Sequence, residues 1–232
     1  MDSPTVRRIL EIGGIVAGLI LIAFGAVTLY LSFDGRSTVQ DNLFNEFIEG
    51  SADMNPEQMK KDIEEVILPN QKLIVQEREK AGLPPIEFTP VSAPSCDVAD
   101  ETIDSGTEAR CFSQYLRLHQ LRDTKGLTYS QLGKYVAKKD APSAKTDFAG
   151  GTDDYFSAEI DAKTNQPVDN PKRDKWVQVT ALSSALNLAY TADQIALFGM
   201  MVAIALLLTG VGLLILAIGV LHRGNEKAAA TT

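Results

Sequence analysis

Two long apolar runs lie near opposite ends of this chain of 232 residues. Residues 12–33 form 22 positions without a charged side chain, and residues 195–221 form 27. About 20 apolar residues are enough to cross the roughly 30 Å hydrocarbon layer of a membrane as a helix. The runs therefore predict transmembrane helices at 9–33 and 195–221. A domain at 34–194 joins them, and tails at 1–8 and 222–232 flank them.

Basic residues beside the runs predict the orientation. Arg7 and Arg8 precede the first run, and Arg223 and Lys227 follow the second. Positive charge favours the cytoplasmic side, so both termini are expected to be cytoplasmic and residues 34–194 extracytoplasmic in a multi-pass protein of the cell membrane. The first run exceeds the 7–15 residues of a cleaved signal peptide, which favours an uncleaved anchor. The 34–194 domain carries a net charge of −9, which is compatible with this placement.

Both cysteines of the chain, Cys96 and Cys111, lie in the 34–194 domain. An even count in an oxidising compartment predicts one disulfide, with two unpaired buried thiols as the alternative. Closing a loop of about 15 residues would stabilise the domain by roughly 3 kcal/mol. A zinc site is not expected, because no pair of histidines lies nearby to complete four ligands.

Helical signals dominate the 34–194 domain. Capping patterns at Asn55 and Ser105 each precede apolar residues at helical spacing. From about Lys175 the helical pattern continues without a breaker into the second apolar run, which predicts one long helix entering the membrane. A turn at 161–165 favours a small hairpin over 155–168. The expected fold class is a mainly α membrane protein whose two transmembrane helices flank a mostly helical extracytoplasmic domain.

Small residues recur on one face of each predicted transmembrane helix. Such stripes let two helices approach closely. The candidate packing residues are Gly14, Gly18 and Gly25 in the first run and Gly199, Ala203, Gly210 and Ala217 in the second. Either the two helices pack on each other, or the stripes bind a second copy of the chain or another membrane subunit. The bilayer itself is the remaining expected partner, and neither run has the central charge that a proton or ion path requires.

Residues that could carry catalysis are scarce. The chain has two histidines, His119 in the 34–194 domain and His222 at the opposite side of the predicted membrane. They cannot share one site, and the G-x-S-x-G signature of serine hydrolases is absent from the sequence. His119 lies on an apolar stripe, which favours a partly buried structural histidine. We therefore predict no enzyme, no cofactor and no metal, and the compartment argues against nucleic acid.

Five stretches carry a resemblance to a known group of proteins. They are residues 35–39 (GRSTV), 111–119 (CFSQYLRLH), 126–129 (GLTY), 163–168 (KTNQPV) and 181–187 (ALSSALN). In these stretches the chain resembles a group of uncharacterised bacterial two-span membrane proteins, some of which are labelled ring-opening dioxygenases. That label implies a non-haem iron site of two histidines and a carboxylate, and the separation of His119 from His222 argues against it. The resemblance implies a topology and not a chemistry.

These observations favour a non-enzymatic membrane protein that acts as an assembly, accessory or scaffold element through an extracytoplasmic interaction domain. The alternative is an extracytoplasmic ligand-sensing module. Because 11 residues follow the second run, such a module would signal through a partner. An enzyme is the third and least favoured class.

Overall fold

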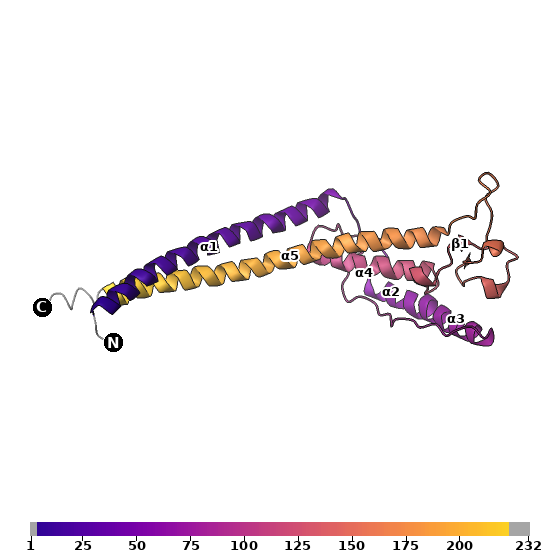
Figure 1. The fold of residues 1–232 in the computed structure, drawn as a ribbon, viewed down its shortest axis with the longest axis horizontal. Coiled ribbons are helices and arrows are strands. Elements are labelled where there is room, and N and C mark those ends of the chain that lie inside the picture. Colours follow the sequence, from indigo (N-terminus) through magenta and orange to yellow (C-terminus); the bar gives the residue numbers. More distant parts are fainter. Residues whose placement is uncertain (1–3, 223–232) are drawn as a thin grey trace. The chain divides into compact units, whose positions relative to one another are not determined.

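The computed structural model describes residues 4–222, so parts of the predicted tails 1–8 and 222–232 lie outside the described residues. The chain is mostly helical (Figure 1). It divides into two compact units. We call Met1–Asn42 with Thr191–Thr232 the paired-helix unit, and Leu43–Tyr190 the central domain.

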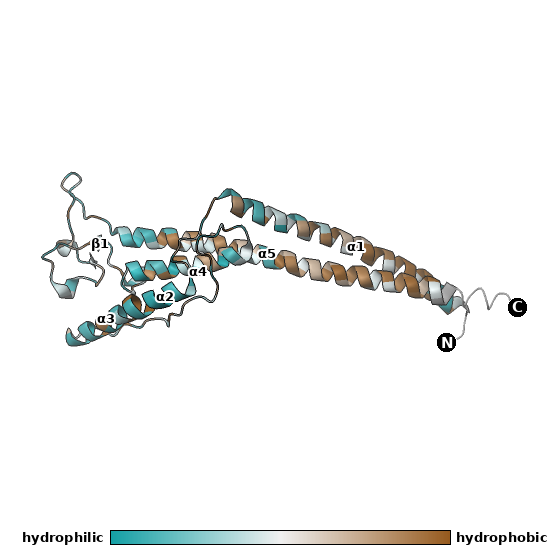
Figure 2. Cartoon of the chain, turned by 180° about the vertical axis from the view of Figure 1, so that it is seen from behind, coloured by the Kyte–Doolittle hydropathy of each residue, from teal (hydrophilic) through white to brown (hydrophobic). Residues whose placement is uncertain are grey.

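Two long helices supply the paired-helix unit. Helix α1 spans Pro4–Asn45, and helix α5 spans Pro171–Leu216 and continues as a π-helical turn, η5, over Ala217–His222. Both contain apolar stretches long enough to cross a membrane, and most of each stretch is exposed (Figure 2). A helix of a soluble core would bury these side chains, so α1 and α5 are candidate membrane-spanning helices.

Both long helices extend beyond the apolar runs. Helix α1 continues through Asp34 and Gly35 to Asn45, because a single glycine weakens a helix without ending it. Helix α5 begins at Pro171, a residue suited to the first helical turn, where its missing N–H leaves no bond unmade.

The first helical part of the central domain starts at the predicted cap. Asn55 Oδ1 accepts a hydrogen bond of 2.9 Å from Gln58 N, and α2 follows over Pro56–Asp62. A π-helical segment, η1, over Ile63–Ile67 leads directly into α3 at Leu68–Lys80. Sequence reasoning expects Leu68-Pro69 to end the first helix. The helical path continues because Pro69 falls in the first turn of α3.

Helix α4, Gly106–Asp123, also starts at the predicted cap. Ser105 Oγ accepts from Glu108 N at 3.3 Å, and the Glu108 carboxylate accepts from Ser105 N at 3.0 Å, which is a complete capping box. The largest fully buried side chains of the central domain include Met59, Ile67, Ile74, Ile103, Tyr115 and Leu127. They come from α2, η1, α3, α4 and the segments around them, so this core is formed between helices.

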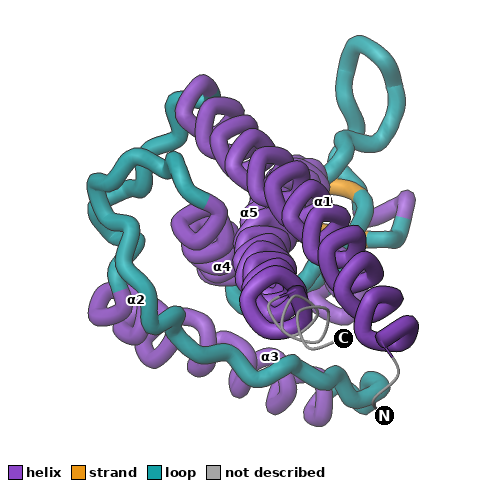
Figure 3. The backbone as a smooth tube through the Cα atoms, turned by 90° about the vertical axis from the view of Figure 1, so that its left-hand side faces the viewer, coloured by secondary structure: helices purple, strands orange, loops and turns teal. Residues whose placement is uncertain are grey.

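Strands are short (Figure 3). Strand β1, Tyr135–Val136, pairs antiparallel with β2, Gly151–Thr152. The turn predicted at 161–165 is present, with Asn165 at φ 54° and a bridge between Ile160 and Pro167 beside it. Single 3₁₀ turns complete this part: η2 at Tyr129–Gln131, η3 at Ser143–Lys145 and η4 at Tyr155–Ser157.

A proline-rich segment without regular structure, residues 83–95, returns from the end of α3 toward α4 and runs beside α2 and α3 (Figures 1 and 3). It is fastened at its far end. Cys96 and Cys111 are joined by a disulfide with a Cα–Cα distance of 6.1 Å, and Tyr115 Oη donates a hydrogen bond of 2.6 Å to the Cys96 carbonyl oxygen. The segment is therefore fixed relative to α4, and it forms one wall of a groove.

Candidate functional site

Helix α4 presents a polar face between two grooves of the central domain. Arg110, Gln114 and Arg117 are exposed and follow the four- and three-residue spacing of one helix face. The opposite face carries Cys111 and Tyr115, which are buried. Gln114 and Arg117 line both grooves, so α4 is the wall that the grooves share.

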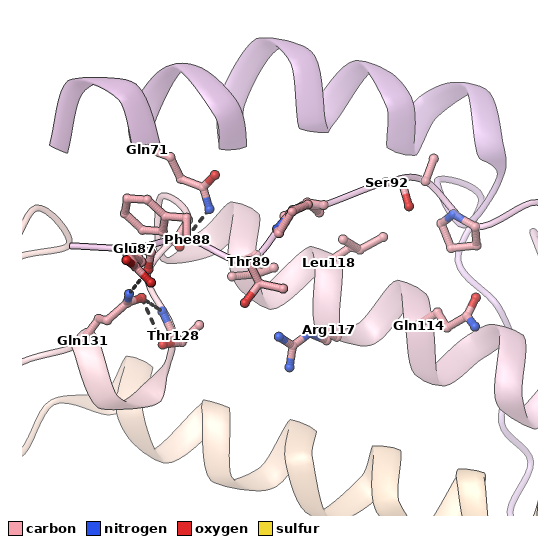
Figure 4. A pocket seen from close by; sticks show the side chains of 16 residues that line it. Gln71, Glu87, Phe88, Thr89, Ser92, Gln114, Arg117, Leu118, Thr128 and Gln131 are labelled. Atoms are coloured by element: carbon pink, nitrogen blue, oxygen red, sulfur yellow. Dashed lines mark hydrogen bonds between the residues drawn. The ribbon is translucent and has the colours of Figure 1, made fainter. Parts of the chain in front are cut away.

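The first groove, which we call the proline-rich groove, has a volume of about 390 Å³ and lies between the 87–94 segment and α4. Figure 4 shows Glu87, Phe88 and Thr89 of the segment on one side and Gln114, Arg117 and Leu118 of α4 on the other. Two side-chain amides hold the closed end. Gln131 Nε2 donates to the Glu87 carbonyl oxygen at 3.2 Å, and Gln71 Nε2 donates to the Gly126 carbonyl oxygen at 3.3 Å.

The second groove, which we call the arginine groove, has a volume of about 290 Å³ and lies between α4 and the part of α5 that belongs to the central domain. None of its lining residues is acidic. They are Arg110, Ser113, Gln114 and Arg117 from α4, and Trp176, Val179, Thr180, Ser183, Ser184 and Asn187 from α5. The central domain as a whole holds 24 acidic and 17 basic residues, so a cationic groove without an acid differs from its surroundings.

The two arginines of this groove are positioned by aromatic rings. The Arg110 guanidinium carbon lies 4.7 Å from the centre of the Tyr190 ring, and that of Arg117 lies 5.9 Å from the centre of the Trp176 ring. Within residues 4–222, neither guanidinium has a carboxylate at ion-pair distance. Stacking on a ring face orients a guanidinium and leaves its N–H groups at the edge available as donors.

A separate ionic cluster joins α4 to α2 on another side. Arg122 Nη1 lies 2.6 Å from Asp62 Oδ2 and 3.3 Å from Asp53 Oδ2. Burial alone would lower the pKa of Arg122, but the hydrogen bonds and charges of Asp62 and Asp53 outweigh it, and the pKa is raised. The arginine therefore stays charged and clamps the two helices.

His119 belongs to this cluster. Its Nε2 atom is buried 3.4 Å from Asp53 Oδ2, and it makes no hydrogen bond with the described part of the chain. Burial lowers the pKa of His119, because desolvation outweighs the attraction of Asp53. The Asp53 carboxyl is shifted too. Its own burial would raise its pKa, but Ser51, His119 and Arg122 together lower it. A partly buried histidine of this kind is what its apolar stripe predicts.

The seven predicted packing residues come together within the paired-helix unit. A Cβ added to Gly14 would lie 3.1 Å from Ala217 Cβ, one added to Gly18 would lie 2.9 Å from the Gly210 carbonyl oxygen, and one added to Gly25 would lie 3.1 Å from the Ala203 carbonyl oxygen. Gly199 faces Ser32 of α1. Small residues on each helix thus receive the other helix of the same chain, which is the first of the two arrangements that the stripes allow.

One ion pair of the paired-helix unit is missing from the sequence predictions. Arg36 Nε lies 3.2 Å from Asp193 Oδ1, and the Asp193 side chain is 4% exposed. The signal for it was present in the sequence. Arg36 follows the first apolar run by three positions and Asp193 precedes the second by two, so opposite charges stand at matched heights on two helices expected to be antiparallel.

Across residues 4–222, no three histidine, cysteine, aspartate or glutamate side chains are grouped so that they could hold a metal ion. Comparison of the chain with protein-family models, curated proteins and solved structures gives no match. A function must therefore be argued from the groove, the cluster and the helices themselves.

Proposed function

We propose that the protein is a non-enzymatic, two-span protein of the cell membrane that acts as an assembly or accessory element. In this proposal both termini are cytoplasmic, and the central domain lies on the extracytoplasmic side and contacts the partner beside α4. The observation that carries the proposal is the pair of open grooves on either side of α4, of which the arginine groove has no acid in its lining. The basic residues that flank both apolar runs support the orientation.

The contacts of the paired-helix unit favour the central domain as the place of partner binding. The small faces of α1 and α5 are used against each other. The large apolar side chains around them, such as Leu19, Phe24 and Ile204, are more than half exposed and suit contact with lipid tails. The helices then serve as an anchor in the bilayer. The partner, either a second copy or another membrane subunit, is recognised by the polar surface of the central domain, and nucleic acid is not a partner in this proposal.

The surroundings of His119 support a role without catalysis. A general base must reach the proton that it removes. His119 Nε2 instead points at the Asp53 carboxylate inside a cluster that joins two helices, and burial keeps the pKa of the ring low. The cluster is accounted for by its contribution to the packing of α4 on α2.

A ligand-sensing module is the second candidate, and the groove volumes favour it. Pockets for small molecules commonly have volumes of roughly 300–1,000 Å³. The proline-rich groove, at about 390 Å³, falls in this range. A sensor of this kind would pass its signal to a partner across the membrane.

Purification of the full chain in mild detergent separates the two candidates. We expect a partner in stoichiometric amount that is lost from the double variant Arg110→Gln/Arg117→Gln and kept by Arg173→Gln. Arg173 is a suitable control, because its guanidinium also stacks on an aromatic ring, 4.3 Å from the centre of Tyr129, outside both grooves. A bound small molecule without a protein partner would favour sensing. A chain that purifies alone and empty would contradict both candidates.

A further inference from the structure

The geometry of the arginine groove points to a specific kind of partner, and this inference rests on the proposed function. We propose that the groove binds an extended acidic segment of a partner protein, with one carboxylate on Arg110 and another, three to six residues along that segment, on Arg117. The argument depends on the charge of the groove, on the separation of the two arginines and on the polar floor between them.

The charge of the groove indicates an anionic ligand. Two guanidiniums face it, no acid lines it, and neither arginine is neutralised by a carboxylate within residues 4–222. Arginine prefers planar oxygen anions, which it can bind through two parallel N–H···O bonds. Such a pair would form with the rings of Tyr190 and Trp176 still stacked on the guanidiniums, because stacking uses the faces of these groups and not their edges.

The separation of the arginines indicates an elongated ligand. Arg110 and Arg117 are two turns apart on α4, which places their Cα atoms about 10 Å apart along the helix. Their guanidiniums are drawn further apart by the rings that they contact, because Trp176 and Tyr190 lie about 21 Å apart along α5. A single phosphate or carboxylate cannot bridge such a gap. An extended peptide covers it in three to six residues, at about 3.3 Å per residue.

The floor between the arginines suits a peptide backbone. Ser113 and Gln114 of α4 face Thr180 and Ser184 of α5 across the groove, so the space between the two charges is lined by hydroxyl and amide groups. Such groups bind the N–H and C=O groups of a main chain without selecting its side chains. In this arrangement the two arginines provide the specificity for acidic positions, and the floor provides the remaining hydrogen bonds.

Trp176 makes the proposal directly testable, because it lines the groove, is the chain's single tryptophan and is 4% exposed. The experiment adds a fluorescein-labelled octaglutamate peptide to the full chain in a neutral detergent and follows peptide anisotropy together with Trp176 emission. We expect binding that weakens as salt is raised, with a change in Trp176 emission, and no binding of the octaglutamine peptide. The double variant Arg110→Gln/Arg117→Gln should bind at least about tenfold more weakly, since it removes two charge-assisted contacts. Arg173→Gln should bind like the wild type.

Two further comparisons make the result decisive. The double variant Arg110→Lys/Arg117→Lys keeps both charges, and its thermal unfolding should match that of the glutamine variant if the domain remains folded. It should recover part of the affinity. Equal binding by the wild type and the glutamine variant, or an equal loss in Arg173→Gln, would overturn the proposal. So would displacement of the peptide by inorganic phosphate or glycerol phosphate at constant ionic strength, which would identify a small-anion or lipid-headgroup site instead.

The failure of this inference can be told from the failure of the proposed function. A stoichiometric partner that remains bound to the glutamine double variant, while the acidic peptide is not bound by any form of the chain, would leave an assembly role standing and exclude the arginine groove as its contact.

Discussion

Two glycines of α5 that are separated by one residue should respond in opposite ways to the same substitution. A Cβ added to Gly210 would lie 2.8 Å from the Gly18 carbonyl oxygen and 3.0 Å from Ile22 N, both backbone atoms of α1. A Cβ added to Gly212 meets no heavy atom within 4 Å. Backbone atoms cannot turn aside as a flexible side chain does, so Gly210→Ala must push the two helices apart, whereas Gly212→Ala need not.

The size of the effect follows from this difference. Replacing glycine by alanine in a helix interior favours the helix by up to about 1 kcal/mol, and this gain applies at both positions. Overpacking a close contact costs about 1–3 kcal/mol. We therefore expect Gly212→Ala to leave the association of α1 with α5 unchanged or slightly strengthened, and Gly210→Ala to weaken it by about 1–3 kcal/mol relative to Gly212→Ala.

The assay is the separation of the two helices in mixed micelles as the fraction of sodium dodecyl sulfate is raised. Energy transfer between fluorophores at the two chain ends would report it. A matching decrease in a dimer band, without a change in this transition, would show that Gly210 contacts a second chain. Identical transitions for Gly210→Ala and Gly212→Ala would refute the packing of α1 on α5 through these glycines.

The other predictions concern the topology, the disulfide and a histidine. Protease added to intact cells without their wall should cut within residues 34–194, and tags at both termini should be protected; the reverse pattern would place the central domain in the cytoplasm. Cys111→Ser should lower the free energy of unfolding of the central domain by about 2–5 kcal/mol, measured by denaturant titration, with Ser113→Ala as a control. Because burial lowers the pKa of His119, the unfolded chain binds more protons just below pH 6.5, so stability should be fully present above that pH and fall as the pH drops toward the folded pKa, by up to about 1.4 kcal/mol per pH unit. His119→Gln should remove this dependence between pH 5 and 6.5, and an unchanged slope would show that another group titrates.

The parts of the fold that could be predicted are those decided by nearby residues. The helix starts at Asn55 and Ser105 are confirmed, because each cap depends on a side chain and an N–H three positions away. The mostly helical character and the two candidate spans are confirmed for the same reason, since periodicity and length are local properties. The positive φ of Asn165 follows from the short turn in which it lies.

The β1–β2 pairing illustrates what local patterns cannot supply. The Asp147 carboxylate accepts hydrogen bonds from Ala149 N and Gly151 N, at 2.7 and 2.8 Å, and from Gly133 N at 2.6 Å. This one side chain ties the loop after β1 to the residue that precedes the strand. An aspartate in a polar loop is ordinarily solvated, so neither its spacing nor its type distinguishes it in advance. Sequence reasoning consequently expected only the later hairpin over 155–168.

The arginine groove was missed for a related reason. The spacing of Arg110, Gln114 and Arg117 on one helix face is visible in the sequence, but a charged helix face most often meets only water. The groove exists because α4 lies along α5 and the rings of Trp176 and Tyr190 receive the two guanidiniums. Positions 117 and 176, or 110 and 190, are too far apart in the chain for a periodic pattern to connect them.

The Arg36–Asp193 pair connects the anchor to this reasoning about partners. Taking a carboxylate out of water costs several kcal/mol unless a counter-charge is close, so the 4% exposed Asp193 requires Arg36 at 3.2 Å. That requirement fixes the height at which α1 meets α5, just where the apolar runs end, while Gly18 and Gly210 fix how closely the helices approach. A helix pair with both its height and its spacing determined by contacts inside one chain has no need of a partner within the membrane. Selection of a partner is then left to surfaces whose charges remain unpaired, and Arg110 and Arg117 of the arginine groove form such a surface.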